Sequence, residues 1–327
     1  MEFMLPLELS KANRLINHQQ KIMSVGSCFT EHIGNALLEF KFKVLQNPNG
    51  ILFDPSSVCT SLLSYLLPKQ YKTDDLFLLH ELWHSWQHHS RFSGMDKDVV
   101  LQQINDSQKK AHLFLKSADW LIITLGSAFS YQLKEDDLKG VANCHRAPAQ
   151  TFRKYFTPIN EIIADLENTI QKLQEFNPQL NIIFTISPVR HIRDGVVENN
   201  RSKARLIEAV HHVVTAFDNL FYFPAYELLI DVLRDYRFYD VDLVHPNYPA
   251  TSFVLEKFQQ AFMSKETMAL TEEIKKIVIA RKHRSANPQT AAHQKFLKIN
   301  LEKANALQVQ YPFLNMQNEI NHFKSTI

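Results

Sequence analysis

The stretch Lys21–Thr30, KIMSVGSCFT, decides the fold because an apolar run leads directly into a helix. Its first five residues, Lys21–Val25, are mostly apolar and predict a short buried strand. Gly26 then permits a sharp turn, and Phe29–Phe40 has the periodicity of an amphipathic helix. A strand followed directly by a helix begins a βαβ unit, so the stretch predicts an α/β protein with a parallel sheet.

Four further apolar runs with β-branched or aromatic residues predict the remaining strands. They are Phe42–Gln46, Trp120–Leu125, Asn181–Ile186 and Asn219–Phe223. Helical periodicity between them is clear in Ile159–Phe176 and Ser202–Phe217. The central runs are almost continuously apolar, which is typical of parallel strands covered by helices on both faces. We therefore predict a three-layer αβα sandwich with a five-stranded parallel sheet in the order 2-1-3-4-5, counted along the chain.

Two segments fall outside this alternation of strands and helices. Residues 75–93 are rich in aromatic side chains and histidine, and we interpret them as an insertion, such as a hairpin. From Lys265 onward the chain is helix-like, with breaks at Asn287-Pro288 and Tyr311-Pro312. We therefore predict a main domain over residues 1–264 and a helical C-terminal extension over 265–327. The extension is a candidate surface for a partner or for homo-oligomerisation.

Composition excludes several classes of protein. The 327 residues are 45% hydrophobic and 21% charged, which is ordinary for a globular protein. A net charge of +2 provides no electrostatic reason to expect nucleic acid as a partner. We see no secretory signal and no apolar run of the roughly 20 residues that a membrane span needs. Three cysteines without a CxxC pair predict reduced thiols in a cytoplasmic protein without a cofactor.

Small and polar residues follow each predicted strand. The segments are Gly26–Thr30, Asn47–Gly50, Gly126–Ala128, Ser187–His191 and, beyond one helix, Asp242–Asn247. Ligands bind beyond the carboxyl ends of the strands in a doubly wound sheet. Because all five segments converge on that edge, we expect the functional site there.

The tripeptide Gly26-Ser27-Cys28 is the first candidate for catalysis. The free N–H groups at a helix start stabilise an anion, so a thiol at Cys28 is expected to have a lowered pKa and to act as a nucleophile. Ser27 is the alternative nucleophile. Taken alone, the tripeptide favours a tight turn whose side chains cap the helix or fill the core, because short motifs often match by chance.

Asp242 and His245 are the second candidate because they lie three residues apart. On one helical turn the two side chains face the same way, and the carboxylate can then orient the imidazole as a base. The alternative is an aspartate that caps a helix beside a surface histidine. A nucleophile on another loop of the same edge favours the catalytic interpretation.

The residues Gly26–Thr30 resemble the signature of the GSCFA-domain family, bacterial proteins grouped with the SGNH/GDSL hydrolase superfamily. The similarity extends over most of residues 15–265. It includes the blocks Asn47–Gly50, Thr124–Gly126, Asn143–His145, Ser187–Arg190, Tyr236–Tyr239 and Asp242–Pro246. Six blocks in the same order make the resemblance specific for this family.

The resemblance implies a role for each matching position. Cys28 takes the position of the nucleophile, with Ser27 where the superfamily usually has aspartate. Asp242 and His245 match the Asp-x-x-His block, in which the histidine is the base. Gly50 matches the glycine whose N–H helps to form the oxyanion hole.

One block departs from the superfamily pattern. Where Gly-x-Asn is expected, this chain has Gly126-Ser127-Ala128, so the side-chain amide of the oxyanion hole is missing. Asn143 is a candidate substitute. Because the loss of one oxyanion donor costs about 3–4 kcal/mol, the gap bears directly on catalytic efficiency.

The resemblance implies an SGNH-like hydrolase or acyltransferase that acts on an ester, thioester or acylated carbohydrate. Its Cys (or Ser)-His-Asp constellation would be surrounded by a substrate pocket. Candidates for that pocket are Asn47, Gly126, Ser127, His145, Arg190 and His89. The alternative, favoured by the missing amide, is a catalytically degenerate binding or interaction protein.

Two further groups of side chains have alternative interpretations. The cluster Arg190, His191 and Arg193 suits a substrate carboxylate or phosphate. The alternative is a salt bridge to Asp194 or Glu198. His80, His84 and His88 have a spacing that aligns metal ligands on a helix, but alternation in the same segment also places them on one face of a strand. Because no HExxH motif accompanies them, we predict no metal site.

Overall fold

The computed structural model describes residues 5–9, 11–135 and 140–326. A five-stranded parallel sheet in the order β10-β9-β5-β1-β2 forms its centre. The strands are β1 (Lys21–Gly26), β2 (Lys43–Gln46), β5 (Trp120–Leu125), β9 (Asn181–Ile186) and β10 (Leu220–Phe223). Counted along the chain, this order is 2-1-3-4-5, and the predicted fold is confirmed.

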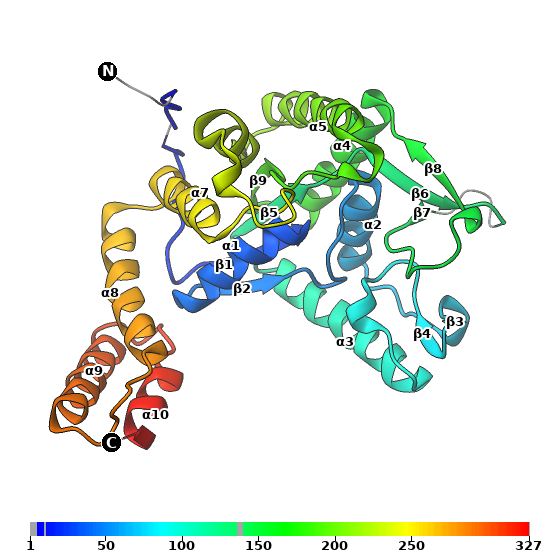
Figure 1. Ribbon diagram of the computed structural model, residues 1–327. Helices are drawn as coiled ribbons and strands as arrows, with labels where there is room; N and C mark the ends of the chain where they lie inside the picture. Colours follow the sequence, from blue (N-terminus) through cyan, green and yellow to red (C-terminus); the bar gives the residue numbers. More distant parts are fainter. Residues whose placement is uncertain (1–4, 10, 136–139, 327) are drawn as a thin grey trace.

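Helices cover both faces of the sheet (Figure 1). They are α1 (Cys28–Glu39), α2 (Pro55–Leu66), α3 (Lys97–Leu115), α4 (Ile159–Phe176), α5 (Val196–Ala216), α6 (Ala225–Glu227) and α7 (Tyr248–Phe262). Helices α2 to α5 share one apolar cluster with the sheet, whereas α1 and α7 share the other. Along β9, Ile182 and Phe184 face the first cluster and Ile183 faces the second. Both faces of the central strands are therefore buried, as their continuous apolar runs predict.

The aromatic insertion contains the predicted hairpin, formed by β3 (Phe77–Leu79) and β4 (Leu82–His84). His80 lies in the turn with a positive φ of 49°. The expectation that three histidines share one strand face is therefore wrong, because the chain reverses at His80 and has left β4 before His88. Among the described residues, no group of three or more His, Cys, Asp or Glu side chains is placed to hold a metal ion.

A second small sheet between β5 and α4 was not expected from the sequence. It consists of β6 (Phe129–Leu133), β7 (Gly140–Val141) and β8 (Phe152–Phe156) in the antiparallel order β7-β6-β8. Arg153 and Lys154 interrupt β8, and both are exposed. A short edge strand with charged side chains lacks the continuous apolar run that identified the central strands.

The C-terminal part contains α8 (Lys265–Lys282), α9 (Ala291–Gln310) and α10 (Gln317–Thr326), and the chain breaks where the prolines predicted. These helices have an apolar cluster of their own. Glu319 on α10 is fully buried and pairs with Lys41 at 2.7 Å and with Arg281 at 3.4 Å. Because Lys41 lies between α1 and β2, this ion pair ties the helical extension to the sheet. No helix in the described part of the chain is both long and apolar enough to span a bilayer.

The turn after β1 requires glycine. Gly26 has a φ of +141°, and a Cβ built on it would lie 2.1 Å from the carbonyl oxygen of Thr124. The same oxygen accepts a hydrogen bond from Ser27 N at 3.1 Å, and Gly26 N donates to Asn47 Oδ1 at 2.9 Å. One turn therefore fixes the carboxyl ends of β1 and β5 and the loop after β2 in a single position.

Gly26→Ala is expected to lower the free energy of unfolding by roughly 2–4 kcal/mol, because the methyl group meets backbone that cannot move away. Urea unfolding followed by circular dichroism measures the change. Gly140→Ala is the matched control, since a Cβ there meets nothing within 4 Å. Equal stability of the two variants would contradict this account of the turn.

Candidate active site

Ser27 and Cys28 lie at the carboxyl end of β1, where α1 begins. Ser27 is the residue before the first turn of α1, and its enclosed Oγ has no hydrogen-bond partner among the residues that the structure describes. Cys28 is the first residue of α1 and is only partly buried. Of the two candidate nucleophiles, the thiol is therefore the more accessible.

The pKa of the Cys28 thiol is raised, contrary to the lowered value expected at a helix start. Burial raises this pKa more than the N–H groups of Phe29 and Cys28 and the charge of Lys203 lower it. Removing the thiolate from water thus outweighs its stabilisation by the end of the helix. Cys28 consequently keeps its proton at neutral pH.

Asp242 and His245 are hydrogen-bonded at the edge of the protein. Asp242 Oδ2 lies 2.6 Å from His245 Nδ1, and Asp242 Oδ1 accepts from Val244 N at 2.9 Å and His245 N at 3.0 Å. Those hydrogen bonds, from the His245 backbone first, lower the pKa of Asp242 to about 2. The two side chains meet in a turn, in which Leu243 has a φ of 58°, and not along a helix as their spacing predicted.

Arg190 braces the loop that carries this Asp-His pair. Its backbone N donates to Val244 O at 3.3 Å, and its Nη1 donates to Leu243 O at 3.4 Å. The guanidinium also lies 4.2 Å from the ring centre of Tyr239 and 5.2 Å from that of Tyr236. Arg190 therefore fastens the loop, coloured yellow in Figure 1, to the segment that follows β9.

The salt-bridge alternative for Arg190 is wrong. Within the described part of the chain, Asp194 pairs with Lys154, and Glu198 pairs with Arg201. In the described coordinates Arg190 instead contacts the loop and the two tyrosines.

Cys28 and His245 share the carboxyl edge of the sheet. Cys28 and Val244, the neighbour of His245, border the same apolar cluster. The charges of both His245 and Lys203 lower the pKa of His191, and Lys203 in turn acts on Cys28. No hydrogen bond joins Cys28 to His245 in the described coordinates, so a proton transfer between them requires closer approach.

In the loop after β2, polar backbone groups form hydrogen bonds with one another. Asn47 is completely buried, and its carbonyl oxygen accepts a hydrogen bond from Gly50 N at 2.7 Å. The Gly50 N–H is therefore already engaged and is not free for the oxyanion role that the resemblance implies. Gly50 has a φ of +84° and abuts His89, whose Cβ would lie 2.1 Å from a Cβ at Gly50. The structure thus places Asn47, Gly50 and His89 together.

Asn143 and His145 belong to a different cluster. Asn143 Oδ1 accepts a hydrogen bond from His145 N at 2.9 Å, and His145 Nε2 lies 2.9 Å from Ser85 O. The His145 ring contacts the ring of Trp86 in the insertion, and burial lowers its pKa to about 4. No hydrogen bond within the described residues links Asn143 to the segments after β1 or β5.

The backbone at Gly126 and Ser127 is also engaged. Both N–H groups donate to Phe53 O, at 2.8 and 3.0 Å, and Ser127 Oγ accepts from Phe129 N at 3.0 Å. The carbonyl oxygen of Gly126 accepts a hydrogen bond from Lys203 Nζ at 2.7 Å. The carboxyl end of β5 is therefore held from two sides.

Lys203 is the residue at this edge that the sequence analysis missed. It is 1% exposed, and its Nζ donates to Gly126 O and to Ser187 O, each at 2.7 Å. Burial lowers its pKa to about 7. A signal was present, because Lys203 precedes Leu206 by three residues and Val210 by seven, and so lies on the buried face of α5.

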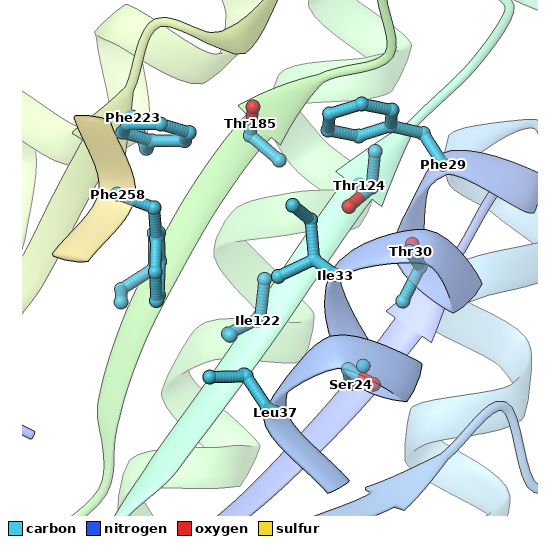
Figure 2. Close-up of a pocket in the computed structure, with 12 residues that line it drawn as sticks. Ser24, Phe29, Thr30, Ile33, Leu37, Ile122, Thr124, Thr185, Phe223 and Phe258 are labelled. Carbon is cyan, nitrogen blue, oxygen red and sulfur yellow. The ribbon is translucent and has the colours of Figure 1, made fainter. Parts of the chain in front are cut away.

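Two cavities lie near this edge, and they differ in size. Figure 2 shows the first, between α1 and the sheet, where Ile33 and Leu37 lie over Ile122. Its volume of about 10 Å³ is too small for a substrate. The second cavity, of about 370 Å³, lies between α2 and β6, and Asp54 at its wall directly follows Phe53. The lining side chains that carry hydroxyl groups are Ser56, Ser57, Thr60, Ser64, Tyr71, Ser130 and Tyr131.

The chain belongs to the GSCFA family, which matches residues 21–258. Residues 274–327 match a second family, described as the C-terminal domain of GSCFA domain proteins. The first match contains the thiol and the Asp-His pair, and the second contains most of the helical extension. No curated protein matches the chain.

Solved structures of carbohydrate esterases are distantly similar. A family 3 carbohydrate esterase from Talaromyces cellulolyticus is 11% identical, with 78% of this chain and 99% of that chain covered and a TM-score of 0.35. A family two carbohydrate esterase from Clostridium thermocellum is 10% identical, with 80% of this chain and 67% of that chain covered and a TM-score of 0.38.

In the wild type the free energy of unfolding is expected to rise with pH because of Lys203, and Lys203→Met is expected to abolish this rise. Between the folded pKa of about 7 and the unfolded value of 10.5, the unfolded chain binds a proton that the folded chain does not. The free energy of unfolding therefore increases with pH in this window, by at most about 1.4 kcal/mol per pH unit. Urea unfolding at pH 7, 8 and 9 measures the difference between wild type and variant.

Lys172→Met on the exposed face of α4 is the control for the loss of a lysine. If the free energies of unfolding of wild type and Lys203→Met differed by the same amount at every pH, the lowered pKa of Lys203 would be contradicted.

Proposed function

We propose that this protein is an SGNH-like hydrolase or acyltransferase that acts on an ester, thioester or acylated carbohydrate. Cys28 is the nucleophile, His245 the general base, and Asp242 the group that orients the imidazole. The observation that carries the proposal is the 2.6 Å hydrogen bond between Asp242 and His245, on a loop at the edge where Cys28 begins α1. This combination supplies the three groups that acyl transfer needs.

Because the Cys28 thiol is protonated at neutral pH, His245 has to remove its proton during the attack on the acyl carbon. Asp242 holds Nδ1, so Nε2 is the nitrogen that accepts this proton. The Sγ–C bond forms, and the resulting tetrahedral intermediate expels the leaving oxygen or sulfur, which takes the proton from Nε2. Water, or an acceptor hydroxyl in the transferase case, then cleaves the thioester with the same base.

The start of α1 contributes to stabilisation of the intermediate. The first N–H groups of a helix have no partner within the helix, and here they belong to Cys28 and Phe29, next to the reacting sulfur. A negative oxygen beside Sγ is favoured by these donors and by the positive end of the helix.

The hydroxyl-rich cavity between α2 and β6 supports a polar, polyhydroxylated substrate. Serine, threonine and tyrosine hydroxyls both donate and accept hydrogen bonds, as sugar hydroxyls do. The cavity begins at Asp54, next to Phe53, whose carbonyl oxygen holds the end of β5. An acylated carbohydrate is therefore the substrate that we favour among the three classes.

Cys28→Ala is expected to lower kcat/KM for p-nitrophenyl acetate by at least about 10³-fold, since no nucleophile remains. His245→Ala is expected to lower it by about 10²–10⁴-fold, which is the usual contribution of a general base. Ser27→Ala should keep most of the activity because Cys28, the proposed nucleophile, is unchanged. Release of p-nitrophenol measures each rate.

The matched control is His212→Ala, which removes another exposed imidazole paired with a carboxylate, in this case Glu167. Activity that survives in both Cys28→Ala and Ser27→Ala would refute the proposed nucleophiles.

A second function is favoured by one observation. The N–H groups of Gly50, Gly126 and Ser127 are all engaged, and the Gly-x-Asn amide is missing, so few donors remain for an oxyanion. A binding protein that retains the pocket without efficient catalysis fits this shortage. Wild-type protein that binds an acetylated sugar but turns over neither it nor p-nitrophenyl acetate would favour this second function.

Alkylation of Cys28 by iodoacetamide is expected to be slow at pH 6 and to accelerate about tenfold per pH unit up to pH 9, because only the thiolate reacts. Mass spectrometry of the Cys28 peptide measures the rate, and the Cys144 peptide, from a thiol whose pKa burial raises to about 11, serves as an internal reference. Fast labelling at pH 6 would contradict the protonated thiol and require a thiolate–imidazolium pair.

A further inference from the structure

The segment after β9 places His191 beside Gly126, the first residue of the block that lacks the side-chain amide. The backbone N of His191 donates to Asn199 Oδ1 at 2.9 Å, which fixes the loop against α5. The ring packs edge to face on Phe53, with 5.4 Å between ring centres and 81° between planes. Its Nε2 lies 3.2 Å from the point where a Cβ at Gly126 would be. The imidazole edge therefore faces the glycine of the incomplete block.

The His191 ring has no hydrogen bond to the described part of the protein, and its Nε2 is buried. The enclosed histidines elsewhere in the described structure differ, because each has at least one ring nitrogen engaged. These are His18 with Phe40 O, His84 with Ser93 Oγ, His88 with Ser85 Oγ, and His145 with Ser85 O. A buried nitrogen without a partner also occurs at His88 Nε2 and His145 Nδ1, so His191 is set apart as a ring with neither nitrogen hydrogen-bonded to the described residues.

The charge state of His191 suits a neutral donor. Burial first, and then the electrostatic effects of Lys203 and of His245 in its protonated form, lower the pKa of His191 to about 4, against an opposing effect of Asp194. At neutral pH the ring is uncharged and carries one N–H. In the tautomer with the proton on Nε2, this N–H is a hydrogen-bond donor on the side of the ring that faces Gly126. A neutral imidazole can polarise a substrate carbonyl group by donating a hydrogen bond to its oxygen. The histidine of triosephosphate isomerase, whose pKa is lowered, acts in this way.

We infer that His191 supplies the oxyanion-hole donor that the Gly126-Ser127-Ala128 segment lacks, with Nε2–H donating to the acyl oxygen of the tetrahedral intermediate. This inference rests on the proposed function, because it completes the same site. Gly126 is then required at its position because a side chain there would crowd Nε2. The donors at the start of α1 and His191 approach the oxyanion from different segments.

The test compares His191→Leu, which removes the donor, with His191→Gln, which restores an amide N–H. With p-nitrophenyl acetate, His191→Leu is expected to lower kcat by about 10²–10³-fold with little change of KM, as loss of an oxyanion donor does. His191→Gln should recover a large part of that loss. His18→Leu is the control, because it removes another buried neutral imidazole, before the start of β1.

Alkylation of Cys28 by iodoacetamide distinguishes two possible roles of His191, oxyanion donor and structural support. Alkylation forms no oxyanion, so loss of an oxyanion donor should not change its rate. The expected result is an unchanged alkylation rate in His191→Leu together with the loss of kcat. Equal losses in His191→Leu and His191→Gln, or unchanged turnover in His191→Leu, would overturn the inference alone. Wild-type protein without turnover would overturn the proposed function and the inference with it.

Discussion

The absence of a Cβ at Gly26 is the constraint on which the site depends. At Gly26 only a hydrogen atom fits beside the carbonyl oxygen of Thr124. This close approach aligns the carboxyl ends of β1 and β5, where Gly26 pairs with Thr124. Asn47 adds its side-chain oxygen to the same turn, so the loop after β2 is placed as well. Cys28 begins α1 directly after this turn, so these backbone contacts also position the start of the helix.

Burial dominates the electrostatics of this edge. The thiol of Cys28, the imidazole of His191 and the ammonium of Lys203 all have pKa values shifted toward the neutral form. The exposed pair of Asp242 and His245 is different, because hydrogen bonds stabilise the carboxylate. The site thus combines groups whose neutral forms are favoured by burial with an ionised Asp242 carboxylate at its rim. In the mechanism that we propose, the proton of the Cys28 thiol passes to His245 during acyl transfer.

The fold was predictable because the information was local. Five apolar runs, the helices between them and the prolines of the extension each have a direct signature in the chain. Strands β6 and β8 were missed because they are short, polar on one face, and stabilised by pairing with each other. The turn at His80 was missed for a related reason. Alternation of residue types continues through it, and the reversal depends on the pairing of β3 with β4.

The sequence by itself determined which residue types follow the strands, and parallel strands carry them to one edge. Only the tertiary structure decided how they are used. Whether the N–H of Gly50 is free, whether burial or a helix end controls Cys28, and whether Lys203 reaches two carbonyl groups all depend on partners distant in the chain. Hydrogen bonds and desolvation depend on which groups are close in space, and the spacing of residues along the chain does not reveal this.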